Sequence, residues 1–228
     1  MLMLYKLQIN HYKMHKLMKK ISFVLFLAIV CISNANAQSL IENFESNSLN
    51  WNETAETNDA GNAIIDKGVL TITSNGVNKF MSAMLGAQVG VNTYFTCFCY
   101  APLNMQRSFK IKSNVTIGKL DYDRLAGLVF NYKDDGTFYA FVFNETDVRF
   151  LRYVDNRLVG QITQSVKWSK TKKMQQEWIM EYDGSTIQFY VDDLPIMKVR
   201  YMPLEYSGFG YYTYGKQKLV VDQVEFIQ

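Results

Sequence analysis

Residues 126–160 read AGLVFNYKDDGTFYAFVFNETDVRFLRYVDNRLVG, and this stretch decides the fold. Runs of apolar, aromatic and β-branched residues alternate with short groups rich in Asp, Asn and Gly, which is typical of strands joined by tight turns. The segment predicts a meander whose four strands cover residues 124–132, 137–144, 148–154 and 157–163. Its turns fall at residues 133–136, 144–147 and 155–156.

The same signals continue on both sides of this stretch. Residues 185–191 alternate with a period of two, since Ile187, Phe189 and Val191 share one face. Asp183-Gly184 and Asp192-Asp193 supply tight turns at the two ends of this strand. Residues 94–100 and 138–143 are apolar on both faces, which predicts one face in the core and the other lining a covered or ligand-bearing concavity.

No long helical periodicity, linker or internal repeat interrupts this pattern. We therefore predict a single all-β domain, a two-sheet antiparallel sandwich or jelly roll.

The N-terminal region has the three parts of an export leader. Lysines between positions 13 and 20 precede the apolar run 23–32, and the small residues 35–37 supply a cleavage signal. That run is well short of the roughly 20 residues that a membrane-spanning helix needs. We expect residues 1–37 to be an N-terminal extension and cleaved secretory signal peptide. Residues 38–228 then form the mature domain, with no transmembrane helix after cleavage.

The expected cleavage changes which chemistries the domain can perform. Both histidines, His11 and His15, lie in the leader, and a chain without histidine excludes a Ser-His-Asp nucleophile and a His-ligated zinc. Of 24 Lys and Arg residues five lie in the leader, leaving 19 against 21 Asp and Glu. A near-neutral domain without a basic stripe predicts no nucleic-acid partner. Cys97 and Cys99 are expected to be buried thiols, although their spacing leaves a strained disulfide open.

The stretch 126–160 is similar to the middle of concanavalin A-like lectin/glucanase (laminin-G-like) jelly rolls of secreted bacterial proteins. Segments that look like the opening, late paired and closing strands of this family follow in its order, at residues 42–51, 177–192, 208–212 and 221–226. The resemblance implies two curved antiparallel sheets, with the first and last strands adjacent. It also implies a concave face that in relatives often meets carbohydrate. Lectins, hydrolases, lyases and interaction modules all use this architecture.

Enzymes of the family place two or three carboxylates at alternating positions of one concave strand, so that one acts as nucleophile and another as acid. Candidate catalytic pairs with this spacing are Asp121 with Asp123 and Glu145 with Asp147. Each pair falls where the chain is expected to turn, so solvated turn residues are the alternative interpretation. The sequence therefore leans away from an enzyme, and a glycoside hydrolase or polysaccharide lyase stays open as the alternative.

Sugar recognition needs an aromatic ring that stacks on the pyranose and polar groups that meet its hydroxyls. Trp51 and Trp178 occur in strand patterns and are expected in the core, and for each candidate tyrosine core packing is the alternative. The candidate ligand-binding residues are Tyr132, Tyr139, Arg149, Arg152, Tyr153, Trp168 and Tyr212.

A calcium ion is the one cofactor that the sequence suggests. Asp134 and Asp135 precede Gly136 and offer carboxylate oxygens of the kind that Ca²⁺ prefers, and a plain Asp-Gly turn is the alternative.

Three functions from different classes remain. The first is an exported non-catalytic carbohydrate-binding domain for glycan capture or breakdown, with exposed aromatics on a concave face. The second is a carbohydrate-active enzyme, which needs two carboxyl groups roughly 5 to 9.5 Å apart in a cleft. The third is a structural or protein-interaction subunit of an envelope complex, with a filled concavity and an exposed apolar patch elsewhere. The final location (periplasm, cell surface or medium), the oligomeric state, the glycan and a start at Met1 or Met18 stay open.

Overall fold

The structure is a computed structural model and describes residues 39–54, 60–76, 94–133, 136–166, 175–200 and 204–228. The chain divides into two compact units, Met1–Gln38 and Ser39–Gln228, and all described residues belong to the second. The expected leader, the calcium candidates Asp134 and Asp135, and the candidate Trp168 therefore lie outside the described residues. Among those that are described, no helix is long and apolar enough to cross a membrane.

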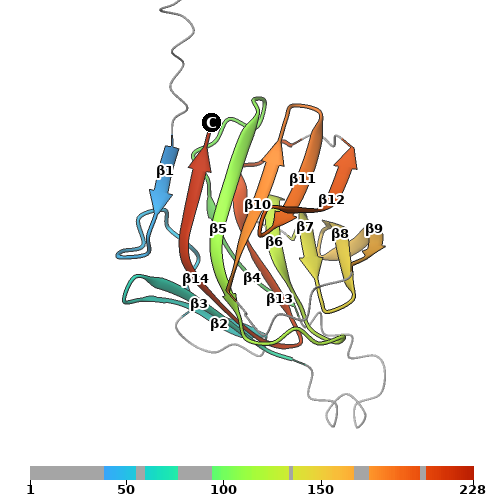
Figure 1. Cartoon of the computed structure of the whole chain (residues 1–228). Helices are drawn as coiled ribbons and strands as arrows, with labels where there is room; N and C mark the ends of the chain where they lie inside the picture. Colours follow the sequence, from blue (N-terminus) through green and yellow to red (C-terminus); the bar gives the residue numbers. More distant parts are fainter. Residues whose placement is uncertain (1–38, 55–59, 77–93, 134–135, 167–174, 201–203) are drawn as a thin grey trace, which may run out of the picture. The chain divides into compact units, whose positions relative to one another are not determined.

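The described chain consists of strands joined by turns and loops (Figure 1). The strands are β1 (Ser39–Glu42), β2 (Gly61–Asp66), β3 (Val69–Asn75), β4 (Tyr94–Tyr100), β5 (Phe109–Ile117), β6 (Leu125–Tyr132), β7 (Phe138–Phe143), β8 (Asp147–Val154), β9 (Arg157–Ser165), β10 (Gln175–Tyr182), β11 (Thr186–Val191), β12 (Leu194–Arg200), β13 (Gly208–Tyr214) and β14 (Lys216–Ile227).

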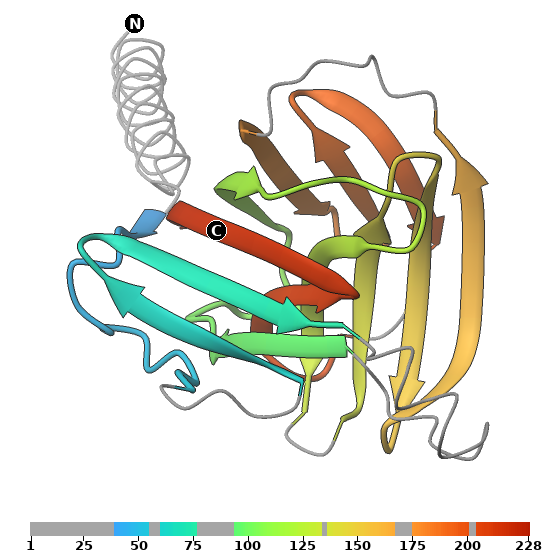
Figure 2. The same ribbon diagram turned by 90° about the horizontal axis from the view of Figure 1, so that it is seen from below.

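These strands form two antiparallel sheets that pack as a sandwich. One sheet has the order β12-β11-β10-β5-β14-β3-β2, with β1 also paired to β14, and the other has the order β4-β13-β6-β7-β8-β9. Figures 1 and 2 show the two layers from directions 90° apart. The predicted all-β antiparallel sandwich is confirmed, and so is the adjacency of the first and last strands, since Ser39 pairs with Ile227.

The predicted meander is present as β6 to β9, with strand ends that differ from the expected ones by at most two residues. The turns Asp155-Asn156 and Asp192-Asp193 each place two residues at positive φ, between 49° and 62°. Two-residue hairpin turns of this hand match the twist of the strands they join, and Asn and Asp tolerate this conformation better than most residues. Local sequence therefore sets these hairpins.

Alternate residues of both sheets fill the core between them. Ile187, Phe189 and Val191 are all buried there, as the period of two predicts. Trp51 and Trp178 are also in this core, which agrees with the sequence interpretation. Across the two sheets, the hydroxyls of Ser113 on β5 and Tyr211 on β13 lie 2.6 Å apart in a buried hydrogen bond.

The two cysteines of β4 are part of the same core. Cys97 and Cys99 are free and buried, which confirms the expectation of unpaired thiols. Burial raises the pKa of both thiols well above the usual range.

Candidate functional site

The six-stranded sheet buries apolar side chains on both faces. On the face that points away from the core, rings from β4, β6, β7, β8 and β13 form a continuous group. We call this group the aromatic floor, and its members are Tyr94, Phe98, Tyr132, Phe138, Tyr153 and Tyr212.

The contacts within the floor show that this face is concave. Tyr94 on β4 and Tyr153 on β8 have ring centroids 5.2 Å apart, although β13, β6 and β7 lie between their strands. In a flat sheet, strands four positions apart would be about 19 Å from each other. The Tyr94 hydroxyl also donates to Asn156 Oδ1 at 3.0 Å, in the turn after β8. These side chains meet only because the sheet curves toward this face, which we call the concave face.

A bulge brings Tyr132 into the floor. Ala126, Leu128 and Phe130 point into the core, so strict alternation would send Tyr132 there as well. The register between β6 and β13 shifts next to Asn131, whose φ is 51°, and the extra residue turns Tyr132 to the concave face. Asn131 is held there because its Oδ1 accepts the backbone N–H groups of Glu205 and Tyr206.

Three tyrosines of the floor, Tyr94, Tyr153 and Tyr212, have raised pKa values. Burial raises the pKa of Tyr94 to about 12, and neighbouring Tyr153 and Tyr132 add to the shift. Burial also raises the pKa of Tyr153 and that of Tyr212, whose hydroxyl hydrogen-bonds to Tyr153. The floor is therefore a neutral, mostly apolar surface at ordinary pH.

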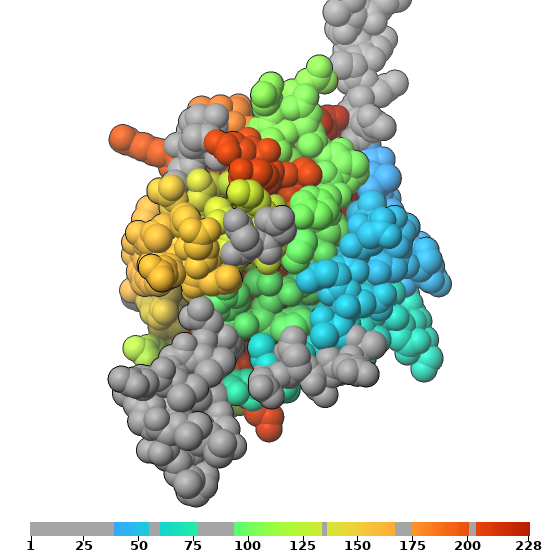
Figure 3. All heavy atoms as spheres, turned by 180° about the vertical axis from the view of Figure 1, so that it is seen from behind, coloured from blue at the N-terminus to red at the C-terminus, as the bar shows by residue number. Residues whose placement is uncertain are grey.

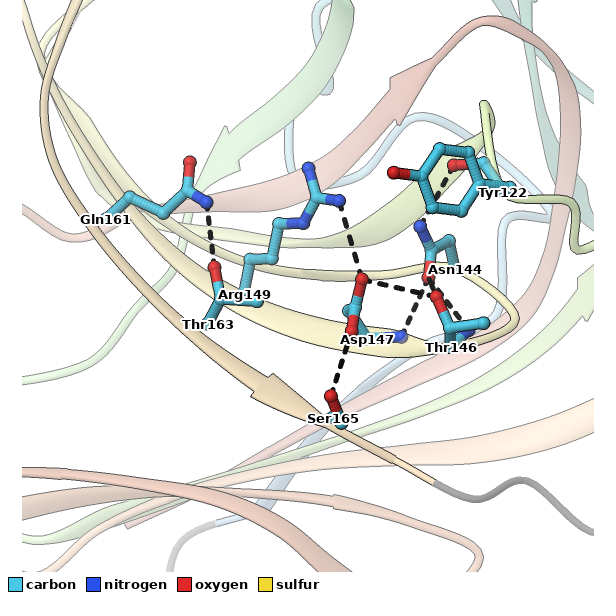
Figure 4. Close-up of polar contacts among 8 residues, drawn as sticks. All are labelled: Tyr122, Asn144, Thr146, Asp147, Arg149, Gln161, Thr163 and Ser165. Carbon is cyan, nitrogen blue, oxygen red and sulfur yellow. Dashed lines mark hydrogen bonds and ion pairs between the residues drawn. The ribbon is translucent and has the colours of Figure 1, made fainter.

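Polar side chains lie beside the floor on β8 and β9 (Figure 4). Arg149 pairs in register with Thr163 and with Val142, which packs with the rings of the floor, so all three side chains lie on the concave face. By the same register Asp147 lies opposite Ser165, and Gln161 lies opposite Leu151, which also packs with the floor. We call the group the polar strip, and its members are Tyr122, Asp147, Arg149, Gln161, Thr163 and Ser165.

Asn144 makes hydrogen bonds both to the turn between β7 and β8 and to the loop before β6. Its Oδ1 accepts the backbone N–H groups of Thr146 and Asp147, at 2.9 and 2.8 Å, so that the side chain itself closes the turn between β7 and β8. Its Nδ2 donates to the carbonyl of Tyr122 at 3.0 Å. The buried Asn144 amide thus anchors the backbone at Tyr122, whose own exposure is 70%.

Arg149 is incompletely paired. Its Nη2 lies 3.7 Å from Asp147 Oδ2, and its Nε is buried without a hydrogen-bond partner among the described residues. The Asp147 carboxylate also accepts from Thr146 Oγ1 at 3.2 Å and from Ser165 Oγ at 3.4 Å. The Arg149 side chain is 25% accessible, so part of it reaches solvent.

The structure brings some of the predicted ligand-binding residues together and separates others. Tyr132, Tyr153 and Tyr212 share the floor, and Arg149 lies in the strip. Tyr139 does not belong to this face, because the alternation of β7 places it in the core against Phe130 and Phe150. Arg152 pairs in register with Tyr139, so it too leaves from the core side of β8, where it is exposed.

The four candidate catalytic carboxylates do not form a concave pair. Asp121 bonds to Lys119 at 2.8 Å and to Arg124 at 3.4 Å, in the loop before β6. Asp123 is exposed in the same loop, and Glu145 is exposed in the turn after β7. Among the described residues of the concave face, Asp147 is the single carboxylate, and Arg149 is its nearest cation.

The described part of the chain contains no candidate metal site of clustered ligands. No group of three or more His, Cys, Asp or Glu side chains is placed there to hold an ion. The two aspartates proposed for calcium are outside that part, as stated above.

Sequence reasoning missed Tyr122, Tyr94, Phe98 and the β9 side chains of the site. The sequence did predict that residues 94–100 have a second face lining a concavity, which the structure confirms, but it singled out neither Tyr94 nor Phe98 on that face. Tyr122 lies in an irregular loop, so no periodic pattern marks it.

Comparison with known proteins gives structural likeness only. No sequence family and no curated protein matches the chain. A β-glucanase of Bacillus licheniformis aligns over 85% of this chain and 99% of its own, with a TM-score of 0.55 and 8% identity. A β-1,3-1,4-glucanase (lichenase) from a mouse hindgut metagenome aligns over 83% and 98%, with a TM-score of 0.56 and 10% identity.

A protein of unknown function with a galectin-like fold from Bacillus subtilis aligns over 84% of this chain and 98% of its own, with a TM-score of 0.54 and 10% identity. Glucanases and a galectin-like protein thus share this arrangement of strands over nearly their whole lengths. The chain therefore has a jelly-roll fold similar to that of these solved structures.

Proposed function

We propose that this chain is an exported, non-catalytic carbohydrate-binding domain that holds its ligand on the polar strip at the edge of the aromatic floor. The observation that carries the proposal is the combination of an exposed ring, Tyr122, with the incompletely paired Arg149. A pyranose stacks its apolar face on a ring while its hydroxyls need donors and acceptors. The strip supplies these from Asp147, Gln161 and Thr163.

The geometry of the strip suits recognition. Asp147 and Arg149 point to the concave face from β8, and Gln161 and Thr163 point to the same face from the neighbouring strand β9. The polar groups therefore form two adjacent rows. The Gln161 amide donates to Thr163 Oγ1 at 2.7 Å, which orients both side chains before any ligand binds. Preorganised polar groups on strands lose less conformational entropy on binding than groups on free loops.

The carboxylates favour binding over catalysis. Hydrolysis of a glycosidic bond normally needs two carboxyl groups, one kept protonated and one ionised. The described concave face offers Asp147, which lies 3.7 Å from Arg149 Nη2. A lone carboxylate can accept hydrogen bonds from sugar hydroxyls, but it lacks the second carboxyl group that hydrolysis needs.

The solved structures that resemble this chain support the same ligand class. They include a β-glucanase, a β-1,3-1,4-glucanase and a galectin-like protein, and the architecture is shared across most of this chain. Fold alone does not carry an activity. The proposal therefore depends on the strip, with the neighbours as supporting context.

The test is a glycan array probed with the purified protein, with and without calcium. We expect binding to at least one glycan, and at least about a tenfold weaker affinity in Tyr122→Ala and in Arg149→Met, because each loses a direct ligand contact. Tyr190→Ala is the matched control, since Tyr190 lies on the outward face of the other sheet and hydrogen-bonds Glu181 there.

Absence of binding to every glycan would overturn the proposal. Release of shorter sugars or unsaturated products from a bound glycan would instead make the chain an enzyme. A signal lost on adding chelator would assign the calcium candidates Asp134 and Asp135 a role in binding.

A protein-interaction role is the second candidate, because the aromatic floor fills much of the concavity with the chain's own rings. Phe138, Tyr153 and Tyr212 are each less than a tenth exposed. Absence of binding to every glycan in the unmodified protein would favour this candidate.

A further inference from the structure

Strand β9 is the end strand of the six-stranded sheet, and it is exposed on both faces. It covers nine residues, of which eight are exposed and Gly160 is half-buried. Leu158, Val159 and Ile162 are 48%, 54% and 51% accessible. Figure 2 shows β9 at the margin of the sheet, and Figure 3 shows β8 and β9 as the yellow-to-orange area on one side of the molecule.

An end strand leaves a row of backbone N–H and C=O groups unpaired, and folded proteins usually protect such rows. Four other strands lie at the ends of the two sheets, β1, β2, β4 and β12; β1 covers only four residues, and each of the other three is protected. At β12 the protection comes from Pro195, which lacks an N–H, from a register shift against β11, and from the charged side chains of Lys198 and Arg200.

The edges of β2 and β4 are protected by the segment between β1 and β2. Thr54 bridges Ala63 of β2, and the Glu53 carboxylate accepts the backbone N–H of Ile65 at 2.8 Å. On β4, Asn52 Oδ1 accepts the N–H of Phe98 at 2.6 Å, and the Asn52 N–H donates to the Phe98 carbonyl at 3.0 Å.

Strand β9 has no comparable protection among the described residues. Residues 157–165 contain no proline, and Arg157 is their only charged side chain. Within the described part of the chain, their side chains make one hydrogen bond to another strand, from Ser165 to Asp147 on β8, which lies on the paired side. The outer edge of β9 therefore has the composition and exposure of a strand that pairs with another strand.

We propose that this edge pairs antiparallel with β9 of a second copy of the chain, around a twofold axis at Ile162. The regular part of the strand, residues 159–165, reads VGQITQS and carries no charge. Centred on Ile162, it pairs with itself so that isoleucine faces isoleucine. Gln161 then faces Thr163 on the concave side, and Gly160 faces Gln164 on the other.

The side chains that this register places opposite each other are chemically compatible. β-branched pairs directly opposite each other stabilise antiparallel strands, and a Gln–Thr pair satisfies polar groups on both strands. The nearest charges in the sequence, Arg157 and Lys167, lie beyond the central seven residues. A strongly acidic or basic partner strand would find no matching charge within residues 159–165, and a second copy brings no charge to these seven positions.

The pairing joins the two six-stranded sheets into one continuous sheet. Because side chains that face each other point to the same side, both concave faces open in the same direction. This consequence rests on the proposed function: two polar strips, one on each side of the axis, would bind a branched or repeating glycan with avidity.

Sedimentation velocity of the purified protein across a range of concentrations tests the pairing without any glycan. We expect a mass that rises toward twice that of one chain. Ile162→Lys and Ile162→Glu each place like charges opposite each other on the axis, so each should weaken the dimer by at least about tenfold. A mixture of these two variants should recover the dimer, since Lys then faces Glu.

Leu194→Lys on β12 is the matched control, because Leu194 is 63% accessible at the start of another end strand. It should leave the dimer unchanged. Circular dichroism checks that all variants fold, as expected for exposed positions. In Ile162→Cys, mild oxidation should give a covalent dimer, because directly opposed residues of antiparallel strands lie within disulfide reach.

A single-chain mass at every attainable concentration would overturn the proposal. So would a dimer that both Ile162 charge variants leave intact, or a mixture of the two that stays monomeric. If the protein binds a glycan while it stays monomeric, the proposed dimer is wrong and the proposed function stands. The two failures are therefore distinguishable.

Discussion

The rings of Phe98 and Tyr132 stack with centroids 4.0 Å apart, although strand β13 lies between β4 and β6. The contact is possible because Gly210 pairs with Phe98 and Gly208 pairs with Tyr132, and neither glycine carries a side chain. A Cβ built on Gly210 would lie 2.1 Å from the Cys97 carbonyl oxygen. The same two glycines thus let the strands approach and let the rings close over them.

We predict that Gly210→Ala destabilises the fold by about 1 to 3 kcal/mol, because the new methyl group meets backbone atoms that cannot move without shifting β4. Gly160→Ala is the control, since the nearest atom to its Cβ is Arg152 Cβ at 3.7 Å, an ordinary contact. Chemical denaturation measures both. Equal midpoints for the two variants would show that the strands at Gly210 can relax.

Arg149→Met should separate function from stability. Among the described residues the guanidinium makes one ion pair, at 3.7 Å, and its Nε is buried without a partner, so its loss should change the free energy of unfolding by less than about 1 kcal/mol. The same variant should lose glycan binding by tenfold or more. Urea unfolding and array binding are measured on the same sample. A large loss of stability would assign Arg149 a structural role.

The floor should make the fold sensitive to alkaline pH. The pKa of Tyr94 is raised from 10.0 to about 12, mainly by burial, so the folded state disfavours its ionised form. The resulting stability is fully present below pH 10 and is lost as pH rises from about 10 to about 12. Thermal unfolding across this range measures the loss.

Tyr94→Phe should have a shallower loss over the same range, because the phenylalanine ring has no proton to release. The native protein should also show delayed ionisation of Tyr94, Tyr153 and Tyr212 in an absorbance titration. Titration of all tyrosines together near pH 10 without unfolding would contradict the burial of the floor.

Cys97 and Cys99 should resist thiol reagents until the protein unfolds. The thiolate is the reactive species, and burial raises the pKa of both groups well above the usual range. In a Cys31→Ser background, we expect two reactive thiols in denaturant without reductant and almost none before unfolding. Absence of reactive thiols in denaturant would reveal a disulfide between them.

Local sequence was sufficient for the elements that depend on neighbouring residues. The strands of the meander and the turns Asp155-Asn156 and Asp192-Asp193 were predicted because alternation and turn chemistry act over a few residues. The core positions of Trp178, Phe189 and Val191 followed from the same period.

The candidate site was predicted only in part, because some of its side chains are positioned by residues far away in the sequence. Tyr132 reaches the concave face through the bulge at Asn131, which depends on backbone groups of residues 205 and 206. Tyr139 was assigned to the site although the alternation of β7 places it in the core. Tyr122 is held by Asn144, from another loop.

The sequence by itself determined an all-β chain, its hairpins and the residues that alternate into the core, because these follow from the period of a strand and the conformational preferences of turn residues. Only the tertiary structure decided that the sheet curves until Tyr94 meets Tyr153, and that Asn144 connects the loop of Tyr122 to the turn before β8. Curvature and register arise from contacts between residues far apart in the chain, and no local pattern encodes them.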